Sequence, residues 1–212
     1  MSEVARLLDR PFVSPNRLTL LGLATGLASA ATAASQAWWW ALGLWLLSRV
    51  MDGLDGPLAR RRSATAEGRP PSSHGSPSSD GSSSSHGSSS GGFLDITADF
   101  TVYGATVVGV AIGATRQYDV AWLPFLLVLF AYYVNGTASL AFSSVAERAG
   151  RQRDDGRSLS FLGGLAEGGE TIAVHSLWLV VPAHAGVIAT VWAVVVGVSA
   201  AQRIVAGFRD LS

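Results

Sequence analysis

The sequence predicts an all-α integral membrane protein, with six transmembrane helices preceded by a short amphipathic helix on the membrane surface. Two properties of the composition carry this prediction. Of the 212 residues, 49% are hydrophobic and only 14% are charged, whereas soluble domains carry about 25% charged residues. Several apolar runs also approach the roughly 20 residues that a helix needs to cross a bilayer. The chain contains no cysteine, which excludes disulfides and thiolate metal sites.

Residues 1–14 are the predicted surface helix. Val4, Leu7 and Leu8 recur at helical spacing beside charged neighbours, as in helices that lie on a membrane. A cleaved signal peptide is not expected here, because the segment is acidic as well as basic and lacks an apolar core. Residues 15–212 are then expected to form a single domain of six spans.

The six predicted spans follow one another closely, except where longer polar segments separate the second from the third and the fourth from the fifth. They cover residues 18–34, 38–58, 93–114, 120–143, 158–181 and 186–207. The tryptophans at 38–40 are expected to form an interfacial aromatic belt. Six spans place both ends of the domain on one side, and most arginines fall in the segments of that side. By the positive-inside rule both termini are cytoplasmic, and we expect a prokaryotic plasma membrane.

A polar tract at about 63–90 separates the second and third spans. Twelve of the 19 positions from Ser72 to Ser90 are serine. Such a composition cannot bury enough apolar surface to offset the entropy lost on ordering. We therefore predict a disordered cytoplasmic insertion.

Two pairs of aspartates flank this tract. Asp52 with Asp55, and Asp95 with Asp99, are three and four residues apart, so each pair shares one helix face. Both pairs lie beside apolar runs, where an ionised carboxylate is costly and indicates a functional site. Hard oxygen ligands favour Mg²⁺, Mn²⁺ or Ca²⁺ over zinc.

The spacing of these residues resembles the signature of the CDP-alcohol phosphotransferases, D-x2-D-G-x2-A-R followed by G-x3-D-x3-D. Its fixed positions are all present, as Asp52, Asp55, Gly56, Ala59, Arg60, Gly91, Asp95 and Asp99. The departure is the spacer at 61–90, which is much longer than is usual in the family.

The resemblance implies a membrane enzyme of phospholipid synthesis. It would transfer a phosphoryl-alkyl group from a CDP-linked lipid to an acceptor alcohol and release CMP. The four aspartates are expected to hold two Mg²⁺ ions, with Mn²⁺ as a substitute, and Asp99 is also the expected general base. The sequence alone does not separate base from ligand. The implied donor contacts are Asn16, Thr19, Gly56, Ala59, Arg60 and Ser88, with Thr65 competing with Ser88 for one position.

Acceptor binding is assigned to polar residues of the last two spans and of the charged loop before them. The candidates are Arg153, Arg157, Arg203, Glu167 and Glu170, and a purely structural pairing of the glutamates with arginines stays open. For Arg49 the alternatives are snorkelling to the interface or a contact with substrate phosphate. His175 is expected to be a core histidine. The partners are the donor, the acceptor and the bilayer; no nucleic acid is expected, and a homodimer is allowed.

A non-catalytic carrier or scaffold that uses the acidic cluster to bind cations is the alternative function. A carrier would place acids at mid-span, between paired and interrupted helices. Here the acids gather toward one surface and no internal repeat is apparent. The acceptor stays open among glycerol phosphate, inositol phosphate and serine, and another use of the CDP-alcohol is also open.

Overall fold

The computed structural model describes residues 15–67, 86–148 and 168–211, and these are almost entirely helical. The elements are α2 (Pro15–Ala34), α3 (Trp38–Glu67), α4 (His86–Tyr118), α5 (Leu123–Arg148), α6 (Gly168–Val180), the 3-10 turn η1 (Pro182–His184) and α7 (Ala185–Leu211). No strand occurs in these three ranges, so the all-α prediction is confirmed for the part of the chain that the structure describes. The predicted surface helix at 1–14 lies outside it.

Each of the six predicted spans overlaps one of these α-helices. Four stretches are long and apolar enough to cross a membrane: Asn16–Ala34, Ser90–Tyr118, Leu123–Arg148 and Pro182–Leu211. Helix α3 is not among them, since its second half contains aspartates and arginines, and the described part of α6 has only 13 residues. The six-span topology therefore stays a prediction.

The helices extend into both ends of the predicted insertion. Helix α3 runs to Glu67 and α4 begins at His86, whereas the sequence predicts disorder over about 63–90. Ala64, Ala66 and Glu67 are strong helix formers, so α3 continues past its apolar part. Residues 68–85 and 149–167, which include the beginning of the predicted fifth span, lie outside the described residues.

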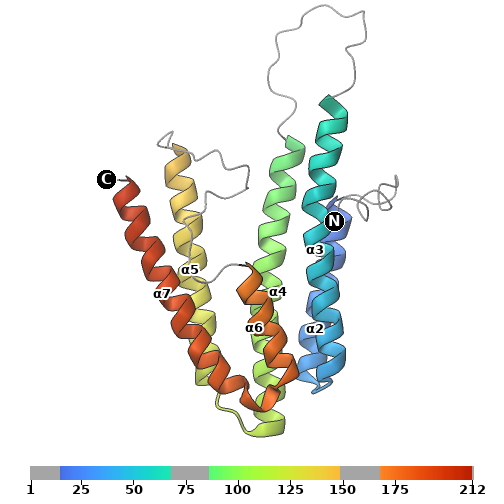
Figure 1. The fold of residues 1–212 in the computed structure, drawn as a ribbon, viewed down its shortest axis with the longest axis vertical. Coiled ribbons are helices and arrows are strands. Elements are labelled where there is room, and N and C mark those ends of the chain that lie inside the picture. Colours follow the sequence, from blue (N-terminus) through green and yellow to red (C-terminus); the bar gives the residue numbers. More distant parts are fainter. Residues whose placement is uncertain (1–14, 68–85, 149–167, 212) are drawn as a thin grey trace, which may run out of the picture.

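The helices form two groups, which α6 and α4 connect. Helix α2 packs against both α3 and α4, α5 packs along α7, and the short α6 lies against α3 (Figure 1). The end of α3 and the beginning of α4 lie at the upper end of Figure 1, which we call the motif end. The turn between α2 and α3 and the link between α4 and α5 lie at the opposite end.

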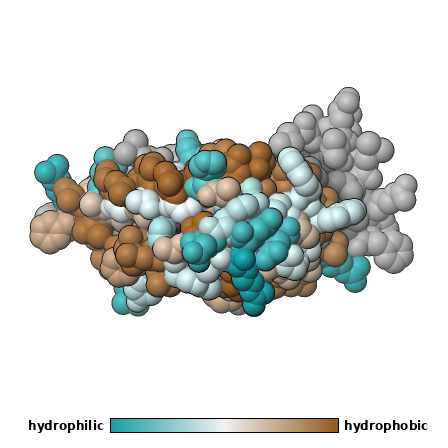
Figure 2. All heavy atoms as spheres, turned by 90° about the horizontal axis from the view of Figure 1, so that it is seen from below, coloured by the Kyte–Doolittle hydropathy of each residue, from teal (hydrophilic) through white to brown (hydrophobic). Residues whose placement is uncertain are grey.

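The outer surface of the bundle is apolar. Leu126, Phe130, Val187, Val191 and Val194 are all more than half exposed. Figure 2, which looks at the end opposite the motif end, shows hydrophobic residues around the periphery. Exposing so large an apolar surface to water is unfavourable, whereas contact with the acyl chains of a bilayer is not. With the four long apolar helices, this surface makes the chain an integral membrane protein.

The first helical hairpin closes with a Schellman turn. Gln36 adopts a positive φ of 66°, and the backbone N–H groups of Gln36 and Ala37 donate to the carbonyls of Ala33 and Thr32, each at 2.9 Å. These bonds satisfy carbonyls that the end of α2 would otherwise leave without a partner.

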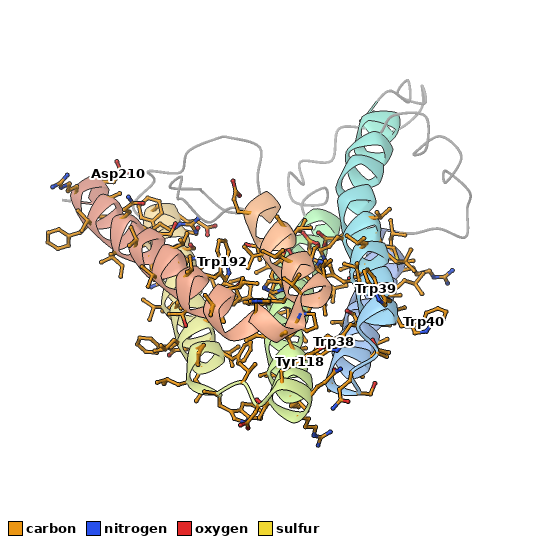
Figure 3. All side chains as sticks on the ribbon, turned by 60° about the horizontal axis from the view of Figure 1, so that its bottom comes forward. Trp38, Trp39, Trp40, Tyr118, Trp192 and Asp210 are labelled. Carbon is orange, nitrogen blue, oxygen red and sulfur yellow. The ribbon has the colours of Figure 1, made fainter. Side chains whose placement is uncertain are left out.

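Only two tryptophans of the predicted aromatic belt face outward. Trp39 and Trp40 are 73% and 76% exposed on the outside of α3 (Figure 3). Trp38 is buried instead, and its Nε1–H donates to Oε1 of Gln117 on α4 at 2.6 Å. The expectation for Trp38 was wrong, because adjacent residues on a helix point in different directions.

Small residues let α2 approach α4 closely. A Cβ added to Gly109 would overlap the carbonyl of Ala30, and one added to Gly113 would overlap that of Ala33. Glycines four residues apart are typical of closely packed membrane helices. Ser29 strengthens the neighbouring α2–α3 contact by donating to the carbonyl of Ala41 at 2.8 Å.

We expect Gly109→Ala to lower the free energy of unfolding by about 1–3 kcal/mol, because overpacking a tight contact costs that much. The control is Gly104→Ala on the same helix, where a Cβ meets nothing within 4 Å and alanine should gain up to about 1 kcal/mol from helix propensity. Unfolding of both variants in detergent measures the difference. Equal stabilities would contradict the close contact.

Candidate functional site at the aspartates

The first half of the motif lies on α3 and is backed by α2. A Cβ at Gly22 of α2 would lie 3.7 Å from Cβ of Met51 and 3.9 Å from the backbone nitrogen of Asp52. The Asp52 side chain is 29% exposed. Helix α2 therefore covers the backbone at Asp52, while the carboxylate keeps access to its surroundings.

The second half lies on α4, next to the beginning of α2. A Cβ at Gly91 would lie 3.6 Å from Oδ1 of Asn16. Asp95 is partly buried and Asp99 follows one turn later, with its side chain 31% exposed. Helix α2 thus contacts both motif halves, the second through Asn16 and the first through Gly22.

Arg49 connects the two halves. Its Nη1 donates to Oδ1 of Asp99 at 2.7 Å and lies 3.7 Å from Oδ2 of Asp52. One cationic nitrogen therefore sits between carboxylates that are 47 residues apart in the sequence. The guanidinium is itself buried, with only 6% of the side chain exposed.

Two aromatic rings hold this guanidinium. Its Cζ lies 5.0 Å from the ring centroid of Trp45 and 5.0 Å from that of Tyr103, which is the range of cation–π attraction. Nη2 also donates to Oγ of Ser48 at 3.2 Å. Arg49 is therefore fixed by groups from both α3 and α4.

A buried aromatic cluster continues from Trp45 to the other helices. His175 of α6 stacks on Trp45, with centroids 4.9 Å apart, and lies 4.7 Å from the Trp178 ring. Its Nε2 is 2.9 Å from the hydroxyl of Tyr132 on α5. That hydroxyl also accepts from Nε1–H of Trp192 on α7 at 2.7 Å. The predicted core histidine is thus a buried link between helices.

The fit of these residues to a divalent cation can be tested from the described side chains. Among them no cluster of three acidic or histidine groups is close enough to hold a metal, and the side chain of Asp55 is not described. Asp52 and Asp99 nevertheless approach a common cationic nitrogen, and their hard oxygens suit Mg²⁺. The chemistry of these two carboxylates suits the predicted metal, and Mg²⁺ binding stays a prediction.

The predicted donor residues have different outcomes. Asn16 is exposed beside Gly91, and Thr19 is buried one turn further along α2. The other four lie on α3 or α4, and the structure describes only their backbone: Gly56, Ala59, Arg60 and Ser88.

Two of the predicted acceptor residues are described. Glu170 is exposed in the first turn of α6. Arg203 of α7 is only 6% exposed, and its Nη1 donates to Oγ of Ser139 on α5 at 2.8 Å. Arg153, Arg157 and Glu167 lie outside the described residues.

Sequence reasoning missed how Arg49 is used. Its proposed roles were snorkelling and phosphate binding, but the structure places it in an ion pair with Asp99. A partial signal was present, since Trp45, Arg49 and Asp52 follow each other at spacings of four and three on one helix face. Tyr103, four residues after Asp99, completes the same pattern on α4.

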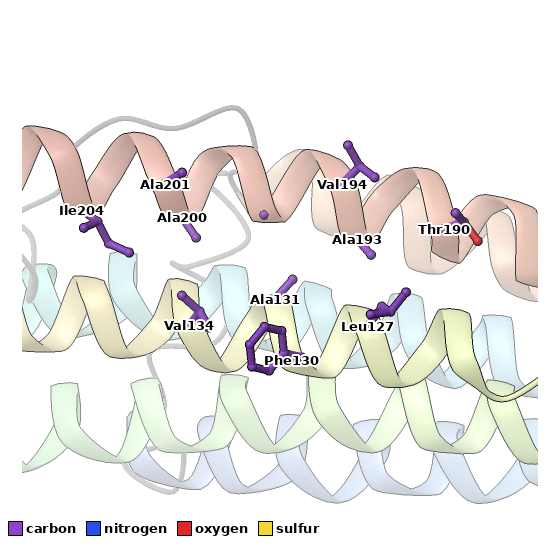
Figure 4. A pocket seen from close by; sticks show the side chains of 11 residues that line it. Leu127, Phe130, Ala131, Val134, Thr190, Ala193, Val194, Ala200, Ala201 and Ile204 are labelled. Carbon is purple, nitrogen blue, oxygen red and sulfur yellow. The ribbon is translucent and has the colours of Figure 1, made fainter.

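A separate groove of about 360 Å³ lies between α5 and α7 (Figure 4). Its lining is apolar except for Thr190, with Leu127 and Phe130 on one side and Val194 and Ile204 on the other. None of the motif aspartates contributes to it. The groove therefore offers no group for chemistry.

Fold and site together define a helical membrane protein with paired aspartates on two helices that the Arg49–Asp99 ion pair joins. The sequence profile of the CDP-alcohol phosphatidyltransferases matches residues 12–68. Inner membrane protein YnjF of Escherichia coli K12 is 35% identical over 189 residues, which covers 86% of this chain and 77% of that protein. The chain belongs to the CDP-alcohol phosphatidyltransferase family.

Solved structures share the fold. Mycobacterium tuberculosis phosphatidylinositol phosphate synthase PgsA1 with CDP-DAG bound is similar with a TM-score of 0.68 and 21% identity, covering 98% of this chain and 92% of that one. The same enzyme in apo form gives a TM-score of 0.65 and 19% identity, covering 97% and 95%.

We expect Tyr132→Phe to destabilise the protein by about 1–3 kcal/mol for each buried polar group left without a partner. The affected groups are Nε1–H of Trp192 and Nε2 of His175. Tyr133→Phe is the matched control, since Tyr133 is the next residue and is 71% exposed. Thermal unfolding in detergent compares them, and equal loss in both variants would contradict a role for the Tyr132 hydroxyl.

Proposed function

We propose that this protein transfers a phosphatidyl-type group from a CDP-linked lipid to an acceptor alcohol in a bacterial inner membrane, with release of CMP. One observation carries the proposal: Asp52 and Asp99, from opposite halves of the family motif, approach the same point between α3 and α4. The CDP-DAG bound to PgsA1 and the inner membrane location in the name of YnjF support the donor and the membrane.

The reaction is a displacement at phosphorus. An acceptor hydroxyl forms a bond to the phosphorus that carries the lipid, and the bond from that phosphorus to the bridging oxygen of CMP breaks. The hydroxyl proton passes to a carboxylate oxygen of Asp99, which acts as general base. The electron pair of the broken bond leaves with CMP.

The other motif residues bind and orient the donor. Asn16 stands beside Gly91, where the first turn of α2 reaches the second motif half. At Gly53 a Cβ would meet nothing within 4 Å, so this face of α3 is open for a ligand to approach. Arg60 would contact the phosphates, since a guanidinium matches their geometry.

The family's divalent cations would be held by Asp52, Asp55, Asp95 and Asp99. When bound, they supply positive charge to the pyrophosphate and to the leaving phosphate. Mg²⁺ is the proposed ion, in a pair, with Mn²⁺ able to replace it.

For the acceptor we favour an alcohol that carries a phosphate. Arg203 is a buried cation on α7, anchored by Ser139, and the 149–157 segment contributes Arg153 and Arg157 from the sequence. A guanidinium binds phosphate through two parallel hydrogen bonds. If the acceptor is neutral or cationic, Glu167 and Glu170 take this role instead.

The direct test supplies purified protein with CDP-diacylglycerol, Mg²⁺ and one acceptor at a time, and measures CMP. Glycerol phosphate, inositol phosphate and serine form the panel. Release of CMP that depends on one acceptor supports the proposal. Absence of CMP with every acceptor, in protein that is folded, would contradict it.

We expect Asp99→Asn to lower kcat by about 10²–10⁴, because a general base contributes that much, while the donor still binds. Asp119→Asn is the control, since Asp119 is exposed at the far end of α4. CMP release and binding of CDP-diacylglycerol are measured for both. Turnover by Asp99→Asn close to that of the wild type would exclude Asp99 as the base.

We expect Arg203→Gln to raise KM for a phosphorylated acceptor while KM for the donor stays unchanged, which is the signature of a residue that binds the acceptor. Arg116→Gln, an exposed arginine near the end of α4, is the matched control. Steady-state kinetics with each substrate varied in turn gives both constants. A rise in both KM values would indicate a general loss of structure instead.

A further inference from the structure

Arg49 occupies the position that a bound cation would take between the motif halves. Its Nη1 is 2.7 Å from one oxygen of Asp99 and 3.7 Å from one oxygen of Asp52. Two carboxylates that approach each other repel unless a positive charge or a proton lies between them. In this structure the guanidinium supplies that charge.

The guanidinium is held in place independently of the aspartates. The rings of Trp45 and Tyr103 lie 5.0 Å from Cζ, and Ser48 accepts from Nη2. Trp45 is itself anchored, because its Nε1–H donates to Oγ of Ser176 on α6 at 3.1 Å and its ring stacks on His175. The Arg49 guanidinium is therefore a charge with a defined position in the site.

A fixed cation on Asp52 and Asp99 affects any divalent cation that binds the same carboxylates. The incoming ion meets like charge, and it must share oxygens that already pair with the guanidinium. Charges a few ångströms apart interact more strongly in a partly buried site than in bulk water. The anionic pyrophosphate of the donor would offset this repulsion by adding negative charge.

We propose that Arg49 is the resident counter-ion of the aspartate site: it holds Asp52 and Asp99 together before substrate arrives, and it makes tight binding of divalent cations depend on the anionic donor. The inference rests on the metal and donor of the proposed function. It assigns Arg49 a positioning role, since the guanidinium acts through the aspartates. The metal and the donor then bind as a coupled pair.

The test measures Mn²⁺ binding to the purified full-length protein in detergent, from the electron paramagnetic resonance signal of free Mn²⁺. Wild type, Arg49→Gln, Arg49→Lys and the control Arg116→Gln are titrated with Mn²⁺ alone and again with CDP-diacylglycerol. We expect Arg49→Gln to bind Mn²⁺ alone at least about fivefold tighter than the wild type, the lower end of typical coupling between sites. Arg49→Lys keeps the charge and should bind weakly, like the wild type and Arg116→Gln.

The second measurement is the effect of the donor on Mn²⁺ binding. CDP-diacylglycerol should tighten Mn²⁺ binding strongly in the wild type and much less in Arg49→Gln. Equal or weaker Mn²⁺ binding by Arg49→Gln would overturn the inference, and so would wild-type protein that binds Mn²⁺ equally well with and without the donor. The wild-type comparison keeps the inference testable even if Arg49→Gln does not fold.

These outcomes separate the inference from the proposed reaction. If no acceptor yields CMP but Mn²⁺ binding changes as expected, the reaction is wrong and the counter-ion role stands. If CMP is released but Arg49→Gln binds Mn²⁺ no better than the wild type, the counter-ion role is wrong and the reaction stands.

Discussion

The ion pair between Arg49 and Asp99 is the contact on which the rest of the site depends. It joins α3 to α4 at the level of the family motif, with Asp52 next to the same nitrogen. A buried guanidinium needs partners on all sides, because an uncompensated charge at that depth is costly. The aromatic rings of Trp45 and Tyr103 supply part of this environment. Both rings pack against α6, so the positions of the aspartates depend on how the helices of the bundle pack.

Local patterns in the sequence predicted the elements well. Apolar runs located all six described helices, and the spacing within each aspartate pair placed Asp95 and Asp99 on one face of α4. Both predictions depend on residues within a few turns of each other, where helix geometry alone decides the outcome. The length of α3 was underestimated. The residues after Arg60 were interpreted from the many serines of the tract, and not from the alanines that precede those serines and continue the helix.

Contacts between distant segments could not be predicted in this way. Arg49 and Asp99 are 50 residues apart, and two interpretations of Arg49 were open until the helices were placed side by side. The outcome for Trp38 was also decided by tertiary structure, because three successive tryptophans carry no information on which of them faces Gln117. Burial of Arg203 against Ser139 has the same origin. Which helix a side chain contacts depends on how the helices are arranged in the bundle. The periodicity of the sequence does not contain this information.

The two hydrogen bonds of Ser48 restrict which residues can replace it at the centre of this bundle. Its single hydroxyl hydrogen is donated to the carbonyl of Gly22 on α2 at 2.7 Å, which leaves only lone pairs for the guanidinium of Arg49. The same oxygen thus fastens two helices together and orients a charge. Alanine at this position would release both at once, and a larger polar residue would push α2 away from the backbone at Asp52. Position 48 therefore favours a small residue that carries a hydroxyl group, although the family motif does not include this position.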